Sequence, residues 1–217
     1  MPSPRDVYVE SGVGMAFDAG SAVWSFDLDL WGHCEQAPQA DEALAAFKKR
    51  HGPVVVCEAI EGDELAFDRD RQPASNDELD LTVTILTNQR ARCFQALADL
   101  PPDALDWDDP GRVLPPWARW RTMRQMLWHI ADAESRYYLP SLGLASRPRA
   151  RELATELRSS HDHVLACLAN LPRDLITASG AEVWTTTKLL RRLAWHERGE
   201  LDAIDDLRRR WAARSIE

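Results

Sequence analysis

TTKLLRRLAWHERGELDAIDDLRRRW, residues 186–211, has the pattern of a long amphipathic helix. Its apolar residues recur every three or four places, which predicts that one face of the helix lies against a core. That face carries Leu189, Leu193, His196, Glu200, Ile204, Leu207 and Trp211. His196 and Glu200 therefore occupy two core-facing positions that leucine would ordinarily fill, and they lie one helical turn apart.

Three upstream segments have the same helical periodicity. They are residues 76–100, 121–139 and 150–171. The first is preceded by Ser75, which has the spacing of a capping box with Glu78, and each of the three is followed by proline. Because four amphipathic helices bury their apolar faces most simply against one another, residues 73–217 are predicted to form a four-helix bundle.

A carboxylate buried at position 200 needs a compensating positive charge. A divalent metal ion would supply that charge, since two donors at i and i+4 of a helix commonly hold such an ion. A third donor, His129, lies at the edge of the apolar face of residues 121–139. We therefore predict a metal site at His129, His196 and Glu200, with open positions for water or substrate. The alternatives are two core histidines satisfied by carboxylates, or Glu200 paired with an arginine.

Two stretches, TMRQMLWHIADAESRYY and WTTTKLLRRLAWHERGELDAI, resemble the signature segments of the DinB/YfiT family of bacterial four-helix bundles. In that family a histidine of the second helix joins an H-x-x-x-H pair of the last helix to bind a divalent metal. His129 and His196 match two of these positions, whereas Glu200 stands where a histidine is usual. A carboxylate ligand favours harder ions, so nickel, manganese and iron join zinc as candidate metals.

The same resemblance implies an activity on a small-molecule substrate. The expected enzymes are metal-dependent hydrolases, or transferases and isomerases that use a low-molecular-weight thiol such as bacillithiol or mycothiol. Glu134, Glu197, Tyr137 and Tyr138 are then candidates for proton transfer or for supporting the metal ligands. Related bundles often associate through their helices, so we expect a homodimer.

The first 72 residues have a strand-like pattern. Strands are predicted over residues 7–9, 13–17, 24–30 and 53–60, the third from the alternation in WSFDLDL. With a helix over residues 40–50 the order is β-β-β-α-β. FDLDLWGHCEQAPQADEALAAFKK resembles the HicB-type antitoxin domain, which implies this fold and a protein partner. The chain is thus predicted to be an α+β protein with two domains, residues 1–72 and 73–217.

Composition excludes several classes of function. A net charge of −9 and a pI near 5.2 argue against nucleic-acid binding, which needs a basic face. No stretch approaches the run of about 20 apolar residues that a membrane helix requires, and MPSPRDVYVE lacks the apolar region of a signal peptide. We therefore predict a cytoplasmic protein whose four scattered cysteines are free thiols.

Two functions follow from these observations. The first is a metal-dependent transferase or hydrolase with an appended α+β domain. The alternative is a non-catalytic binding or regulatory protein, in which the HicB-like part recognises a partner and the bundle is a scaffold with a vestigial metal site.

Overall fold

A computed structural model describes residues 3–214 of the chain. The outermost residues of the two predicted domains, 1–2 and 215–217, lie outside this range. Contacts divide the chain into two units, Met1–Thr82 with Pro172–Trp195 and Val83–Leu171 with His196–Glu217. The predicted boundary between residues 72 and 73 falls inside the first unit, and the domain organisation itself stays a prediction.

The first unit contains a mixed four-stranded sheet with the strand order β3-β2-β1-β4. Its elements are β1 (Arg5–Val13), β2 (Gly20–Trp24), β3 (Cys34–Ala37), α1 (Ala40–His51) and β4 (Val54–Glu61). β1 and β3 pair antiparallel to β2, whereas β4 pairs parallel to β1 after the crossover through α1. α1 packs against the sheet around Val7, Val9, Val23 and Phe47, which are buried. The predicted order β-β-β-α-β is therefore confirmed.

The predicted bounds of the first strands are wrong. Residues 7–9 and 13–17 are not two strands, because β1 runs continuously to Val13 and Gly12 lies at a bulge with φ 76°. The strand predicted over 24–30 keeps only Trp24, and Leu28–Leu30 form a short 3-10 helix, η1. Asp27 and Asp29 keep solvent exposure but do not belong to a strand, and both accept hydrogen bonds from Arg5.

The opposite side of the sheet has a second apolar core. It is formed by Val13, Met15, Ala22, Trp24 and Phe67, with Trp195 packed against it. Gly32 has φ 73°, and a Cβ there would lie 2.6 Å from the Ala194 Cβ. Glycine at this turn therefore allows the turn to contact the last helix closely. A two-stranded hairpin, β5 (Ile176–Ser179) and β6 (Glu182–Thr185), also belongs to this unit and was not predicted.

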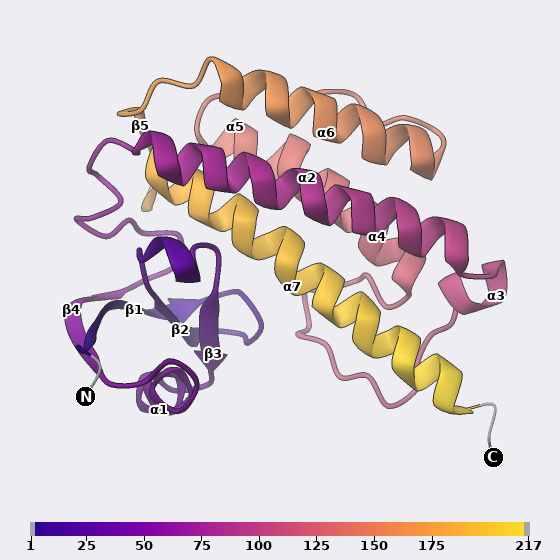
Figure 1. Ribbon diagram of the computed structural model, residues 1–217, viewed down its shortest axis with the longest axis horizontal. Coiled ribbons are helices and arrows are strands. Elements are labelled where there is room, and N and C mark those ends of the chain that lie inside the picture. The colour runs from indigo at the N-terminus through magenta and orange to yellow at the C-terminus, as the bar shows by residue number, and fades with distance from the viewer. Residues whose placement is uncertain (1–2, 215–217) are drawn as a thin grey trace. The chain divides into compact units, whose positions relative to one another are not determined.

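Four long helices confirm the predicted helical segments (Figure 1). They are α2 (Asn76–Asp99), α4 (Met123–Ala133), α6 (Leu153–Ala169) and α7 (Thr186–Ala213), with the single turns α3 (Pro102–Leu105) and α5 (Leu139–Ser141) between them. The capping box at the start of α2 is present, because Glu78 accepts from the Ser75 N–H at 2.7 Å and Ser75 Oγ accepts from the Glu78 N–H at 3.1 Å. In the second unit the apolar faces meet around Cys93, Met126, Leu157, Leu201 and Ile204.

The helix predicted over residues 121–139 contains an irregularity. After α4 the chain forms a π-helical turn, η2 (Glu134–Tyr138), before α5. A π-helical turn accommodates one extra residue, so it shifts the residues that follow around the helix axis. A regular helix would place Tyr137 on the same face as the buried Ile130, seven residues earlier. Tyr137 is instead 42% exposed, and Tyr138 is buried.

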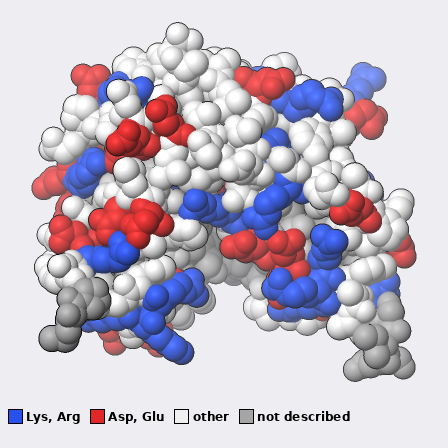
Figure 2. Space-filling view, in the orientation of Figure 1, with Lys and Arg blue, Asp and Glu red and all other residues white. Residues whose placement is uncertain are grey.

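On the face drawn in Figure 2, acidic and basic groups are interspersed. Within residues 3–214, no helix combines the length and the apolar composition needed to cross a bilayer.

Candidate metal centre

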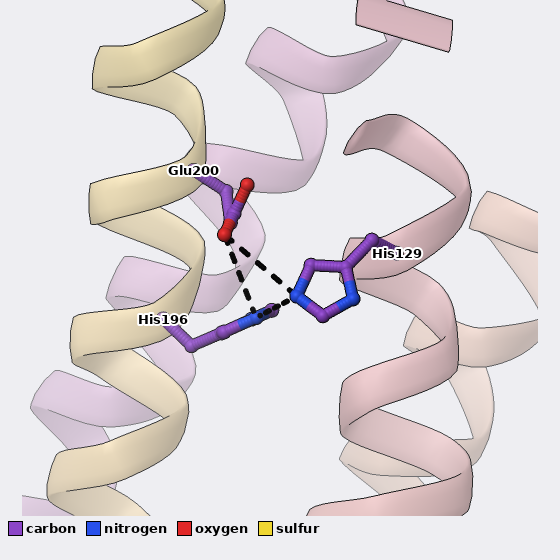
Figure 3. Close-up of side chains that lie close together, drawn as sticks. All are labelled: His129, His196 and Glu200. Atoms are coloured by element: carbon purple, nitrogen blue, oxygen red, sulfur yellow. Dashed lines mark hydrogen bonds and ion pairs between the residues drawn. The ribbon is translucent and has the colours of Figure 1, made fainter. Parts of the chain in front are cut away.

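The three side chains predicted to bind metal lie together in the second unit (Figure 3). His129 extends from α4, and His196 and Glu200 extend from α7 toward it. The Nε2 atoms of the two histidines are 3.0 Å apart. Glu200 Oε1 lies 3.7 Å from His129 Nε2 and 4.0 Å from His196 Nε2. The donors named from the sequence therefore form one cluster.

Local sequence fixes where each donor lies along its helix. α4 starts with a capping box in which Thr122 Oγ1 accepts from the Gln125 N–H at 3.3 Å and Gln125 Oε1 accepts from the Thr122 N–H at 3.2 Å. His129 follows Thr122 by seven residues, which is about two helical turns. On α7, His196 and Glu200 lie at i and i+4 on one face. Two regular helices thus orient all three donors.

Burial sets the charge of the cluster. It lowers the pKa of His129 to about 4, so its imidazole is neutral at pH 7. Burial also raises the pKa of Glu200 to about 7, although Arg112 and a hydrogen bond from the Trp120 side chain oppose that shift. Glu200 Oε2 is buried and has no hydrogen-bond partner among residues 3–214. The cluster therefore offers two nitrogen donors and a carboxylate whose ionised form lacks sufficient compensation.

The connection before α4 supports this cluster. The Trp120 indole stacks on the His129 ring, with 3.4 Å between ring centroids and 10° between planes. Arg112 Nη1 donates to the backbone oxygens of Trp120 and Arg121 at 2.9 and 2.8 Å. Of the tryptophans in this connection, Trp120 contacts the cluster, whereas Trp107 packs against Trp211. One indole thus stacks directly on one of the three donors, His129.

The two candidate catalytic acids are paired with an arginine. Glu134 and Glu197 are fully buried and both bind the guanidinium of Arg90 on α2. Arg90 Nη2 lies 2.5 Å from Glu134 Oε2 and 2.8 Å from Glu197 Oε1. Burial, together with the neighbouring Glu134, raises the pKa of Glu197 well above its usual value. These carboxyl groups therefore form a buried ion cluster with Arg90.

The tyrosine candidates separate because of η2. Tyr137 is exposed and its ring lies 5.1 Å from that of Tyr138. Tyr138 is 5% exposed, and its ring centroid lies 5.4 Å from that of His196 in an edge arrangement. Tyr138, and not Tyr137, is therefore the tyrosine beside the metal-ligand candidates.

One supporting residue, Arg90, was missed in the sequence. Arg90 follows Leu86 by four residues and precedes Cys93 by three, so it lies on the buried face of α2. A charge on an apolar face was the signal that identified Glu200, and it would have identified Arg90 as well. No such signal assigns a contact to Trp120, because it lies in an irregular connection whose contacts no periodicity predicts.

The geometry of the cluster fits a small divalent cation. Ligand atoms that share an ion at about 2.0–2.2 Å lie roughly 3–3.5 Å from one another. The separation of 3.0 Å between the two Nε2 atoms meets this requirement. The Glu200 distances of 3.7 and 4.0 Å require only a small movement of that carboxylate.

Comparison with known proteins identifies a relative of the helical part. A model of the DinB superfamily matches residues 85–204, more than half of the chain. A search of curated proteins finds no match. A solved structure with a similar fold is YfiT from Bacillus subtilis, described as a probable metal-dependent hydrolase with an unusual four-helix bundle topology. The two proteins share 21% identity with a TM-score of 0.51, over 65% of this chain and 92% of YfiT.

Proposed function

We propose that this chain, which belongs to the DinB superfamily, is a metal-dependent hydrolase whose cation is held by His129, His196 and Glu200. The observation that carries the proposal is the convergence of these three donors from α4 and α7, with a buried Glu200 Oε2 that no described residue satisfies. The description of YfiT as a probable metal-dependent hydrolase supports the choice of reaction class.

The donor set suits a catalytic rather than a structural ion. Three protein ligands leave at least one coordination position open, which is typical of catalytic zinc and related sites. When bound, such a cation lowers the pKa of a water molecule or polarises a carbonyl group. One carboxylate and two imidazoles suit zinc, nickel, manganese and iron.

The chain's own residues prepare the site in three ways. Burial keeps His129 neutral, so a nitrogen lone pair is available. Trp120 stacks on the His129 imidazole, which restrains that donor. Buried surroundings exclude water from His196, whose side chain is 6% exposed. Together these contacts preorganise the donors and reduce the cost of ordering them around an ion.

Metal analysis of the purified protein tests the proposal. We expect one divalent ion per chain, and titration of Co²⁺ into the metal-free protein should give a saturable visible spectrum. His196→Ala and Glu200→Ala should abolish this binding. His163→Ala is the matched control, because His163 bonds the Ala145 carbonyl outside the cluster. A protein that holds no ion, or a His196→Ala variant that binds as the parent does, would contradict the metal site.

The hydrolase assignment needs a separate assay. The metal-loaded protein should cleave at least one member of a panel of ester, amide and phosphoester substrates, and a chelator should stop the reaction. If metal binds stoichiometrically but transfer to a small thiol replaces hydrolysis, the reaction class is wrong. If metal binds and neither reaction occurs, the non-catalytic binding or regulatory role is favoured.

Three expectations outside the metal site stay predictions. Light scattering should show a homodimer, and a particle of 24.6 kDa, the mass of one chain, would exclude it. The family match covers residues 85–204 and so does not test the HicB-like resemblance of the N-terminal part or its partner. Nucleic-acid binding is expected to be absent because of the net charge of −9.

A further inference from the structure

A groove of about 410 Å³ lies beside the metal-ligand candidate His129. Three segments line it: the connection before α4, the exposed side of α4 and the segment before α6. The Trp120 and Trp128 indoles supply flat apolar surface, and Arg119 and Arg149 supply positive charge. Since His129 belongs to both the groove and the donor cluster, a ligand in this groove lies against one of the donors.

The polar groups of the groove are mostly hydrogen-bond donors. No ion pair or hydrogen bond engages the Arg119 side chain within residues 3–214. Arg149 lies over the Trp128 ring at 4.0 Å, with Asp132 Oδ2 at 3.6 Å. Gln125 Oε1 accepts hydrogen bonds from the backbone N–H groups of Arg121 and Thr122, so the remaining polar group of this side chain is the NH₂ donor.

The single carboxylate of the groove is already engaged. Asp132 Oδ1 accepts from the guanidinium of Arg136, one turn further along the chain. Its charge is therefore shared between Arg136 and Arg149, and Arg119 remains as an uncompensated cation of the groove. A groove with donors, positive charge and indole faces is complementary to a planar group that ends in an oxyanion.

We propose that this groove binds the anionic end, a carboxylate or a phosphate, of the substrate that reacts at the metal centre. Arg119 and Arg149 hold the oxyanion, and Trp120 and Trp128 flank the apolar part next to it. The role of this anion as a substrate rests on the proposed function, but binding of the oxyanion itself requires no metal. It names the substrate class, an organic anion, that the hydrolase would accept.

Binding of small aromatic anions to the metal-free protein tests the groove. We expect benzoate or phenyl phosphate to shift the imidazole resonances of His129 in ¹⁵N-histidine-labelled protein in a saturable manner. The two anions distinguish a carboxylate from a phosphate preference. Benzamide, which has the shape of benzoate without its charge, should bind at least ~10-fold more weakly, because it loses charge-assisted hydrogen bonds.

A double variant separates the groove from general anion binding. Arg119→Ala/Arg149→Ala should weaken benzoate or phenyl phosphate binding by at least ~10-fold. Both side chains are exposed, so the fold should be unaffected. Arg50→Ala/Arg209→Ala is the matched control, since it removes the same charge from side chains that are 68% and 70% exposed outside the groove. Equal binding of benzamide, or unchanged binding by the groove variant, would overturn the proposal.

Metal titration of the same variants keeps the two proposals apart. Arg119→Ala/Arg149→Ala should bind Co²⁺ as the parent does, because neither arginine is a donor to the ion. If the parent protein does not bind Co²⁺, the metal centre is refuted, and the anion-binding result can still be interpreted. If the parent protein binds Co²⁺ but gives no response to benzoate or phenyl phosphate, the groove proposal is refuted and the metal centre is still supported.

Discussion

Each unit buries a cluster of charged side chains, and the two clusters differ in their balance of charge. In the first unit three cations meet three carboxylates, Lys188, Arg191 and Arg192 with Glu10, Glu64 and Asp70. In the second unit one cation, Arg90, meets Glu134 and Glu197. Glu200 lies further along α7 with no arginine or lysine within 4.0 Å in the described part of the chain.

This difference indicates which cluster needs something from outside. A balanced buried cluster pairs its own charges, so it needs no counter-ion from outside. A cluster with excess carboxylates must instead take up protons or bind a cation. Burial raises the pKa of both Glu197 and Glu200, which is the expected response to missing positive charge. The second unit is therefore where a divalent ion would reduce an existing electrostatic cost.

Removing the only cation of the second cluster should have the largest effect. Arg90→Met leaves Glu134 and Glu197 facing each other without a positive charge at less than 2% exposure. We expect a loss of about 3–5 kcal/mol in the free energy of unfolding, because one partner of a buried ion cluster has been deleted. Urea denaturation at pH 7 measures it.

A compensating variant sharpens that test. Arg90→Met/Glu134→Gln/Glu197→Gln removes the charges together, so most of the loss should be recovered. Arg158→Met is the matched control, because its guanidinium lies over the Phe94 ring and not in the cluster. If Arg90→Met lowers the free energy of unfolding by less than about 1 kcal/mol, Arg90 does not offset buried negative charge on Glu134 and Glu197.

The balanced cluster of the first unit should respond to acid. Burial alone would raise the pKa of Glu64, but Arg192 and Lys188 outweigh it and lower the pKa from 4.5 to about 2. A carboxyl group with a lowered pKa in the folded state stabilises the protein fully above pH 4.5, and this contribution disappears as the pH falls toward 2. Its size is ~3 kcal/mol.

Comparison with Glu64→Gln isolates this contribution. The difference in unfolding free energy between the parent and the variant should be largest near pH 6 and should shrink steadily between pH 4.5 and pH 3. Glu42→Gln, at an exposed position of α1, should show no comparable trend. A parent-minus-variant difference that stays constant from pH 6 to pH 3 is incompatible with the pairing of Glu64.

The regular part of the molecule was predictable from periodicity, and the remainder depended on tertiary contacts. The stripe on α7 placed His196 and Glu200 on one face, where the structure brings them together with His129, and the order of helices followed from caps and prolines. The alternation in residues 24–30 misled, because the strand ends at Trp24 and the chain forms a short 3-10 helix, at which Arg5 binds Asp27 and Asp29. The π-helical turn η2 changed the phase of α4, so Tyr138 replaced Tyr137 on the buried face.

Contacts made by irregular segments could not be read from spacing at all. The stacking of Trp120 on His129 joins a connecting segment to a helix, and no local pattern specifies which ring the indole meets. The donors of the cluster were therefore predictable, whereas the groups that restrain them were not.

Trp120 also gives the smallest predicted effect, because it acts on the donors without binding the ion. Trp120→Phe keeps an aromatic face against His129 but has a smaller ring than the indole. Replacement of a group that orients metal ligands typically weakens metal affinity by 10–100-fold. We expect the lower end, ~10-fold, for Trp120→Phe and the upper end for Trp120→Ala.

Competition with a chromophoric chelator measures both affinities at pH 8, above the pKa of about 7 for Glu200, so that proton competition is small. Trp117→Phe is the control, because its ring lies 5.8 Å from that of Trp120 and it is 40% exposed. If Trp120→Ala binds the ion as tightly as Trp117→Phe, the helices alone fix the donors. If metal affinity instead falls in steps from the parent to Trp120→Phe and then to Trp120→Ala, the connection before α4 helps the cluster to bind a metal ion. The excess negative charge of the second unit is then met by that ion rather than by protons.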